Sequence, residues 1–99
     1  MEVKVQFVKM PTSESMEAFV NKKLEKLATK YEWVLKADVF YKLENDAKGK
    51  GKICDIKLSL PGPLLFATSD QSSFEAATDE TIRDIEKQLK KRKSEMKPY

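Results

Sequence analysis

The sequence predicts one α+β domain, in which four strands form a single sheet and two amphipathic helices pack on the same face of it. Two observations predict this class. Three short segments carry apolar residues at every second position, which is the period of a strand with one buried face, and a fourth segment returns as a strand after a turn. Two longer segments carry apolar residues at intervals of three and four, which is the period of a helix. The elements follow one another in the order β-α-β-β-β-α, and 99 residues suit one domain with one core.

The first strand and the first helix are separated by a short break. Residues 2–8 alternate, with Val3, Val5 and Phe7 on one face. Pro11 and Thr12 end the alternation, and Ser13 is the expected N-cap of a helix over residues 14–31. The apolar face of this helix is formed by Met16, Phe19, Val20, Leu24, Leu27 and Tyr31.

Three further strands are predicted over residues 34–44, 52–60 and 64–69, joined by hairpin connections and therefore antiparallel neighbours. Residues 45–51 are rich in turn formers, and residues 60–63 (LPGP) fit a type II turn with proline and then glycine at its centre. The side chains expected to face the core are Ala37, Val39, Tyr41, Leu43, Cys54, Ile56, Leu58 and Leu60.

The last predicted helix, residues 74–96, sorts its charge along its length. Residues 70–86 hold six acids and one base, whereas residues 87–97 hold six bases and one acid. The apolar stripe thins after Leu89, so we expect the basic end to project past the sheet into solvent. The apolar face consists of Phe74, Thr78, Ile82, Ile85 and Leu89.

The composition argues against several classes of function. Histidine is absent, which removes the usual general base and the commonest metal ligand. Cys54 is the only cysteine and alternates with core residues, so we interpret it as a small buried hydrophobe. No apolar run approaches a membrane span, and the N-terminus lacks the apolar core of a signal peptide. We therefore expect a cytoplasmic protein that is not an enzyme and has no cofactor, no small-molecule substrate and no membrane partner.

Two groups of basic residues are candidates for binding a polyanion such as a phosphate backbone. Lysines on the first helix form a row with a spacing of four residues, and bases on the last helix point away from its apolar face. Solvated helix faces with Glu–Lys pairs, or bases that complement the helix dipole, would explain the same pattern. Charge alone leaves both interpretations open. The residues are Lys22, Lys23, Lys26 and Lys30 on the first helix, and Arg83, Lys87, Lys90 and Lys91 on the second.

A series of short motifs extends over nearly the whole chain in a fixed order and spacing. With these motifs the sequence resembles the short ribosome hibernation-promoting factors, the family that includes ribosome-associated inhibitor A, also called protein Y. The motifs are Ser13-x-x-Met16-x-x-Phe19-Val20-x-Lys22-Lys23-Leu24-x-Lys26-Leu27, Tyr41-Lys42-Leu43-Glu44, Asp55, Gly62, Ala67, Phe74-Glu75-Ala76-Ala77-x-Asp79 and Lys87-Gln88-Leu89-Lys90-Lys91.

The resemblance implies a βαβββα fold similar to double-stranded RNA-binding domains. It implies binding to the small ribosomal subunit and its rRNA in the channel between head and body, at the positions of messenger RNA and of the A- and P-site transfer RNAs. Translation would be silenced and the idle ribosome protected, without catalysis. The basic positions of the family fall on Lys23, Lys26, Lys87, Lys91, Arg92 and Lys93, and Lys22, Lys30 and Lys90 extend the same surfaces. If the helices pack side by side, we expect their basic ends to frame one groove.

Because the chain ends at Tyr99, we expect one ribosome-binding domain over residues 1–99, a short form without a C-terminal dimerisation domain and a monomer when free. Two alternatives remain at this point. One is a generic module that binds structured RNA, and the other is a protein-interaction domain whose basic helix is only a solvated face. The salt dependence of binding separates an RNA partner from a protein partner.

Overall fold

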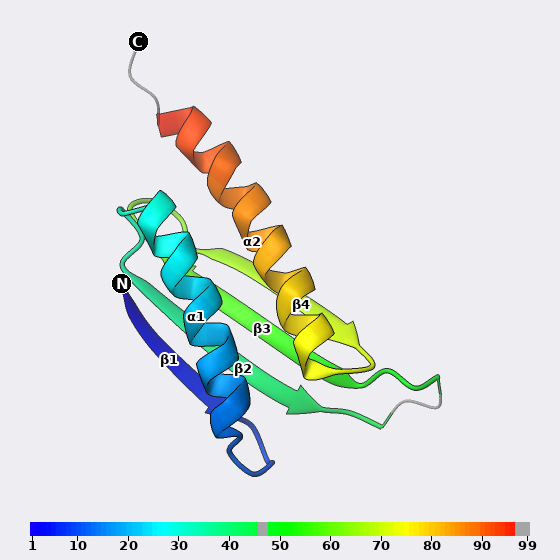
Figure 1. Cartoon of the computed structure of the whole chain (residues 1–99). Coiled ribbons are helices and arrows are strands. Elements are labelled where there is room, and N and C mark those ends of the chain that lie inside the picture. Colours follow the sequence, from blue (N-terminus) through cyan, green and yellow to red (C-terminus); the bar gives the residue numbers. More distant parts are fainter. Residues whose placement is uncertain (46–47, 97–99) are drawn as a thin grey trace.

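A computed structural model describes residues 1–45 and 48–96 and confirms the α+β class and the order of the elements (Figure 1). Parts of the predicted 45–51 loop and of the C-terminal tail, residues 46–47 and 97–99, lie outside the described residues. The predicted bounds agree with the observed ones to within two residues at every end. The elements are β1 (Glu2–Phe7), α1 (Glu14–Lys30), β2 (Lys36–Leu43), β3 (Lys52–Ser59), β4 (Leu65–Gln71) and α2 (Phe74–Met96).

The four strands form one mixed sheet in the order β1-β2-β3-β4. β1 runs parallel to β2, to which α1 connects it, and the pairs β2–β3 and β3–β4 are antiparallel. The register aligns inward-facing residues across the entire sheet, since Val39 pairs with Val5 on one side and Ile56 on the other, and Ile56 pairs with Ala67. Alternation along each strand thus becomes one continuous apolar face.

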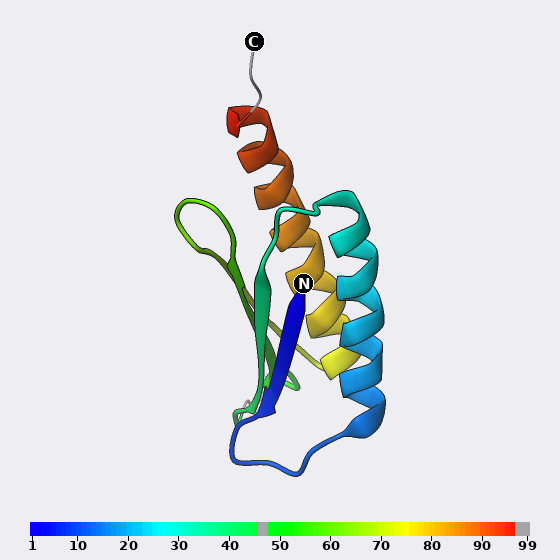
Figure 2. The ribbon, with the colours of Figure 1, turned by 90° about the vertical axis from the view of Figure 1, so that its left-hand side faces the viewer.

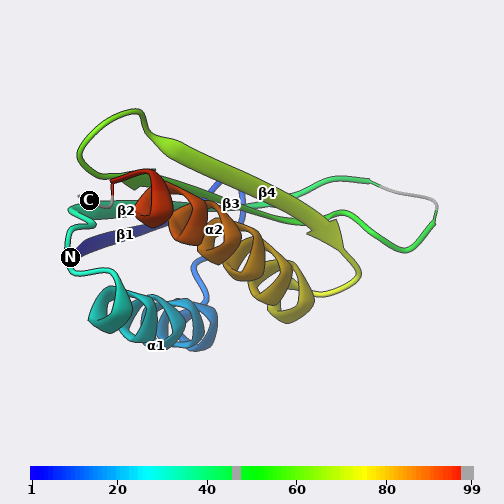
Figure 3. The ribbon, with the colours of Figure 1, turned by 90° about the horizontal axis from the view of Figure 1, so that it is seen from above.

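Both helices cover this apolar face and leave the opposite face of the sheet open (Figures 2 and 3). Each helix has a serine cap. The Ser13 hydroxyl accepts a hydrogen bond from the Met16 amide at 3.2 Å, as expected from the sequence, and the Ser73 hydroxyl accepts one from the Ala76 amide at 3.1 Å. The caps satisfy amide groups that have no partner within the helix.

Tyr41 lies at the centre of the core and joins the sheet to α2. Its ring stacks on Phe7 with centroids 5.3 Å apart and meets Phe74 edge-on at 5.4 Å. Its hydroxyl bonds to that of Thr78 at 2.7 Å, and Thr78 donates to the carbonyl oxygen of Phe74. Thr81 donates to the carbonyl oxygen of Cys54 on β3 at 3.0 Å. Because α2 is anchored by these buried hydroxyls, its rotation about its own axis is determined.

For one residue, the prediction that it faces the core was wrong. Leu43 was expected to face inward with Tyr41, but its side chain is 53% exposed. Phe74, the first residue of α2, packs on Tyr41, so Leu43 lies two residues further toward the hairpin end of the sheet. Strand periodicity identifies the face of a residue but cannot show where the covering helix begins.

Because the thiol of Cys54 is buried, the fold loses stability as the pH becomes alkaline. Burial raises the pKa of this thiol from 9.0 to about 11, so the folded protein holds the proton more tightly than the unfolded chain. This contribution is complete below pH 9 and is lost as pH rises toward 11, by at most about 1.4 kcal/mol per pH unit. Urea unfolding across this range should show a shallower decline for Cys54→Ala than for the parent. Equal declines would contradict the assignment.

Candidate nucleic-acid interface

A groove of about 430 Å³ runs between α1 and α2. Its apolar lining comes from Phe19 and Leu27 of α1 and Ile82 of α2. Four lysines line the α1 side and an acid, Glu86, lies on the α2 side. All four lysines of the predicted first-helix set are therefore brought to one groove: Lys22, Lys23, Lys26 and Lys30.

Two of the four groove lysines are paired with acids of α2. The Nζ atom of Lys23 lies 2.7 Å from a carboxylate oxygen of Asp79 and 4.9 Å from the centre of the Phe19 ring. The Nζ atom of Lys30 lies 3.2 Å from a carboxylate oxygen of Glu86. These groups are partly exposed, so each pair contributes at most about 1 kcal/mol.

The other two groove lysines are unpaired. Lys22 and Lys26 are exposed, and within residues 1–45 and 48–96 neither forms an ion pair or a side-chain hydrogen bond. They lie one helical turn apart, about 6 Å along the axis of α1. Two mobile ammonium groups are thus free to act as point charges on an anionic partner.

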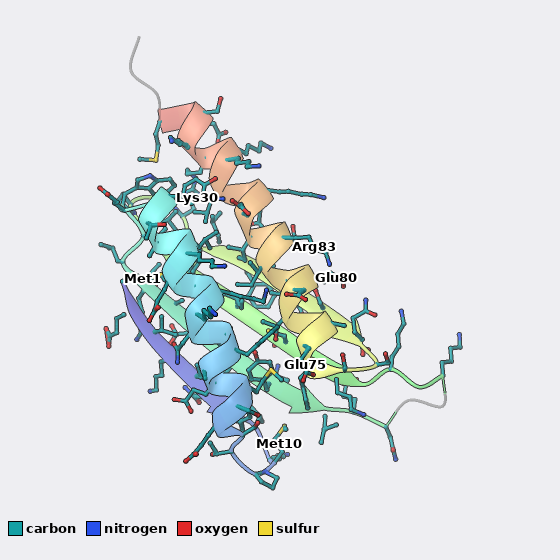
Figure 4. The ribbon with its side chains drawn as sticks, in the orientation of Figure 1. Met1, Met10, Lys30, Glu75, Glu80 and Arg83 are labelled. Atoms are coloured by element: carbon teal, nitrogen blue, oxygen red, sulfur yellow. The ribbon has the colours of Figure 1, made fainter. Side chains whose placement is uncertain are left out.

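The first basic residues of α2 lie outside this groove. Arg83 and Lys87 line a separate hollow of about 390 Å³ on the β4 side of α2, together with Thr68 and Ser69. Figure 4 shows the same separation, with Lys30 at the end of α1 and Arg83 on the far side of α2. The expected single groove therefore does not include these two residues, because the docking of α2 rotates them toward β4.

The end of α2 projects beyond the sheet and beyond α1, as the thinning apolar stripe predicted (Figures 1 and 2). Lys90 and Lys91 are exposed there and have no ion pair among the described residues. Lys93 turns toward α1, with its Nζ atom 5.9 Å from the centre of the Tyr31 ring. Lys93 therefore reaches back to the end of α1, at the residue that follows Lys30 in the sequence.

Arg92 differs from its basic neighbours because it binds the chain itself. Its guanidinium donates hydrogen bonds to the carbonyl oxygens of Pro61 at 3.2 Å and Pro63 at 2.9 Å. Gly62 between them has φ +95°, and a Cβ atom there would lie 3.1 Å from the guanidinium. Arg92 thus fastens the β3–β4 loop to the projecting helix. Sequence reasoning missed this role, since the partners are 29 and 31 residues away.

Other kinds of site find no support in the part of the chain that the structure describes. Residues 1–45 and 48–96 contain no group of three or more His, Cys, Asp or Glu side chains that could hold a metal ion. Within the same ranges, neither helix is long and apolar enough to cross a membrane.

Comparisons with known proteins match both the sequence and the fold. The family model described as Sigma 54 modulation protein / S30EA ribosomal protein matches residues 3–97. A ribosomal subunit interface protein from Coxiella burnetii has the same fold, with a TM-score of 0.82, 21% identity, and coverage of 95% of this chain and 99% of that chain. The N-terminal domain of Protein Y from Thermus thermophilus matches with a TM-score of 0.78 and 25% identity. The match covers 92% of this chain and 98% of that chain. No curated protein matches this chain.

The two hydrogen bonds from Arg92 to the β3–β4 loop, here called the Arg92 clamp, predict that two adjacent basic residues contribute differently to stability. Arg92→Ala should lower the free energy of unfolding by about 1 kcal/mol, because two hydrogen bonds from a charged but partly exposed donor are lost. Lys91→Ala, at an exposed position without an ion pair among the described residues, should change it by less than about 0.5 kcal/mol. Urea unfolding of both variants measures the difference, and equal effects would show that the clamp does not contribute to stability.

Proposed function

The chain belongs to the sigma 54 modulation protein / S30EA ribosomal protein family, and from this premise we propose that it is a ribosome hibernation factor. It binds the small ribosomal subunit through rRNA in the decoding channel, at the positions of messenger RNA and of the A- and P-site transfer RNAs. Bound there, it inhibits translation by blocking these positions and stabilises idle ribosomes. It acts in the cytoplasm, and the activity requires neither a cofactor nor a chemical step.

The observation that carries this proposal is the set of exposed lysines without partners on the helix pair. Ammonium groups on flexible stems bind phosphates without reading bases, which suits a partner recognised by backbone and shape. Structured RNA is recognised largely in this way. Among the residues that the structure describes, Lys22 and Lys26 on α1 and Lys87, Lys90 and Lys91 on α2 have no ion pair.

The fold supports a rigid mode of occlusion. The lysines stand on two helices that are held to one sheet by a common core, so the relative positions of their backbones are set before binding. A preorganised surface loses little conformational entropy on association. The projecting end of α2 extends the charged surface beyond the body of the domain, where it can reach between RNA segments (Figure 2).

Sedimentation with purified small ribosomal subunits tests the proposed site. At low salt the protein should pellet with the subunits, and high salt should release it, because each phosphate contact adds up to about 0.9 to the log–log salt slope. Initiator transfer RNA should displace it. Failure to pellet at low salt would overturn the function and favour a protein-interaction domain, and binding unaffected by transfer RNA would favour a generic RNA-binding module.

Reversal of the charge of three lysines on α2 tests whether these residues bind the subunit. The variant Lys87→Glu/Lys90→Glu/Lys91→Glu should weaken subunit binding by at least about a hundredfold and lower the salt slope by about 2.7, if each lysine contacts one phosphate. Circular dichroism should show an unchanged fold, because the three side chains are exposed.

A matched control separates the site from net charge. Lys4, Lys50 and Lys57 are exposed, and Lys4 and Lys57 lie on the open face of the sheet and Lys50 in the β2–β3 loop. Changing these three to Glu alters the net charge equally and should reduce affinity only modestly. Equal losses in both variants would show that overall charge, and not the α2 surface, governs binding.

A further inference from the structure

The acidic half of α2 provides two carboxylates that pair with lysines of the groove: Glu86 lines the groove itself, and Asp79 binds the groove lysine Lys23. Asp79 and Glu86 are seven residues apart, about two turns, so they lie on the same side of α2. Lys23 and Lys30 have the same separation on α1, and the two pairs meet at 2.7 Å and 3.2 Å. The helices run in the same direction (Figure 1). Matching intervals on parallel helices therefore produce two ion pairs across one groove.

The helix dipole does not explain these two acids. Its effect is confined to the first turn of a helix, which in α2 contains Glu75. Asp79 lies in the second turn and Glu86 in the middle of the helix. Their common feature is the lysine that each one faces.

The pairs divide the lysines of the groove into two kinds. Lys23 and Lys30 are neutralised within the fold, whereas Lys22 and Lys26 remain open to an external anion. A phosphate chain that entered the groove to reach all four lysines would have to displace both carboxylates and would then lie beside two like charges. An RNA that contacts only Lys22 and Lys26, at the rim of the groove, does not have to displace the carboxylates and does not lie beside them.

We propose that Asp79 and Glu86 are specificity-determining residues, which close the groove to loosely structured polyanions while an RNA docked across its rim leaves both ion pairs intact. The inference rests on the proposed function and assigns a role to charges that this function does not use. Repulsion of wrong partners is a common source of specificity, and here it operates through carboxylates held within the fold.

The double variant Asp79→Asn/Glu86→Gln tests this proposal. It should bind a short poly(U) RNA roughly tenfold more tightly than the parent, with a log–log salt slope steeper by about 1.4, because two more lysines become available to a single strand. Its affinity for small ribosomal subunits should change no more than that of a control with equal net charge.

The control is Glu25→Gln/Glu32→Gln. Both residues are exposed, neither lines the groove between the helices, and neither is ion-paired among the described residues. The control reports the long-range effect of two lost negative charges. Equal poly(U) affinities and salt slopes for the double variant and the control would overturn the proposal, as would an equal gain for poly(U) and for subunits.

Two further measurements separate a failure of this proposal from unfolding of the variant and from a failure of the proposed function. If the double variant unfolds, Asp79→Asn alone, with the Lys30–Glu86 pair retained, should steepen the poly(U) slope by about 0.7, and an unchanged slope would overturn the proposal. Parent protein that fails to pellet with subunits would overturn the proposed function alone, because the poly(U) titrations still report whether the groove is closed.

Discussion

The docking of α2 on the sheet is the constraint on which the rest of the structure depends. The hydroxyls of Thr78 and Thr81 are buried and bonded to Tyr41 on β2 and to the Cys54 carbonyl on β3, and both bonds would be costly to break in a dry core. They set the rotation of the helix about its axis. That rotation in turn decides which charges of α2 face α1, which face β4 and which face solvent.

One consequence is that residues of the same type have different roles on the same helix. Lys90 and Lys91 are exposed and unpaired among the described residues, whereas Arg92 binds the β3–β4 loop. On α1, Lys22 and Lys26 are open and Lys23 is tied to Asp79. The formal charge of +3 says little about such a surface. What matters for an anionic partner is how many cations already have a partner inside the fold.

In the proposed function, the open lysines and the ion pairs between the helices suit RNA of defined shape. The core holds both helices in place, and Asp79 and Glu86 pair with two of the four lysines of the groove. Membership of the S30EA ribosomal protein family is consistent with a ribosomal partner. The physical argument for backbone contact needs only lysines at the right places, without base-specific groups.

The sequence by itself determined the class of the fold, the order and approximate bounds of the elements, the Ser13 cap and most of the core. These properties follow from periodicity and local chemistry, which depend on near neighbours in the chain. The lysines of the candidate site could likewise be named from the sequence. Only the tertiary structure decided that β1 runs beside β2 and that Leu43 lies beyond α2. It also decided which lysines are paired, because Lys30 and Glu86 are 56 residues apart and meet only once both helices have docked on the sheet.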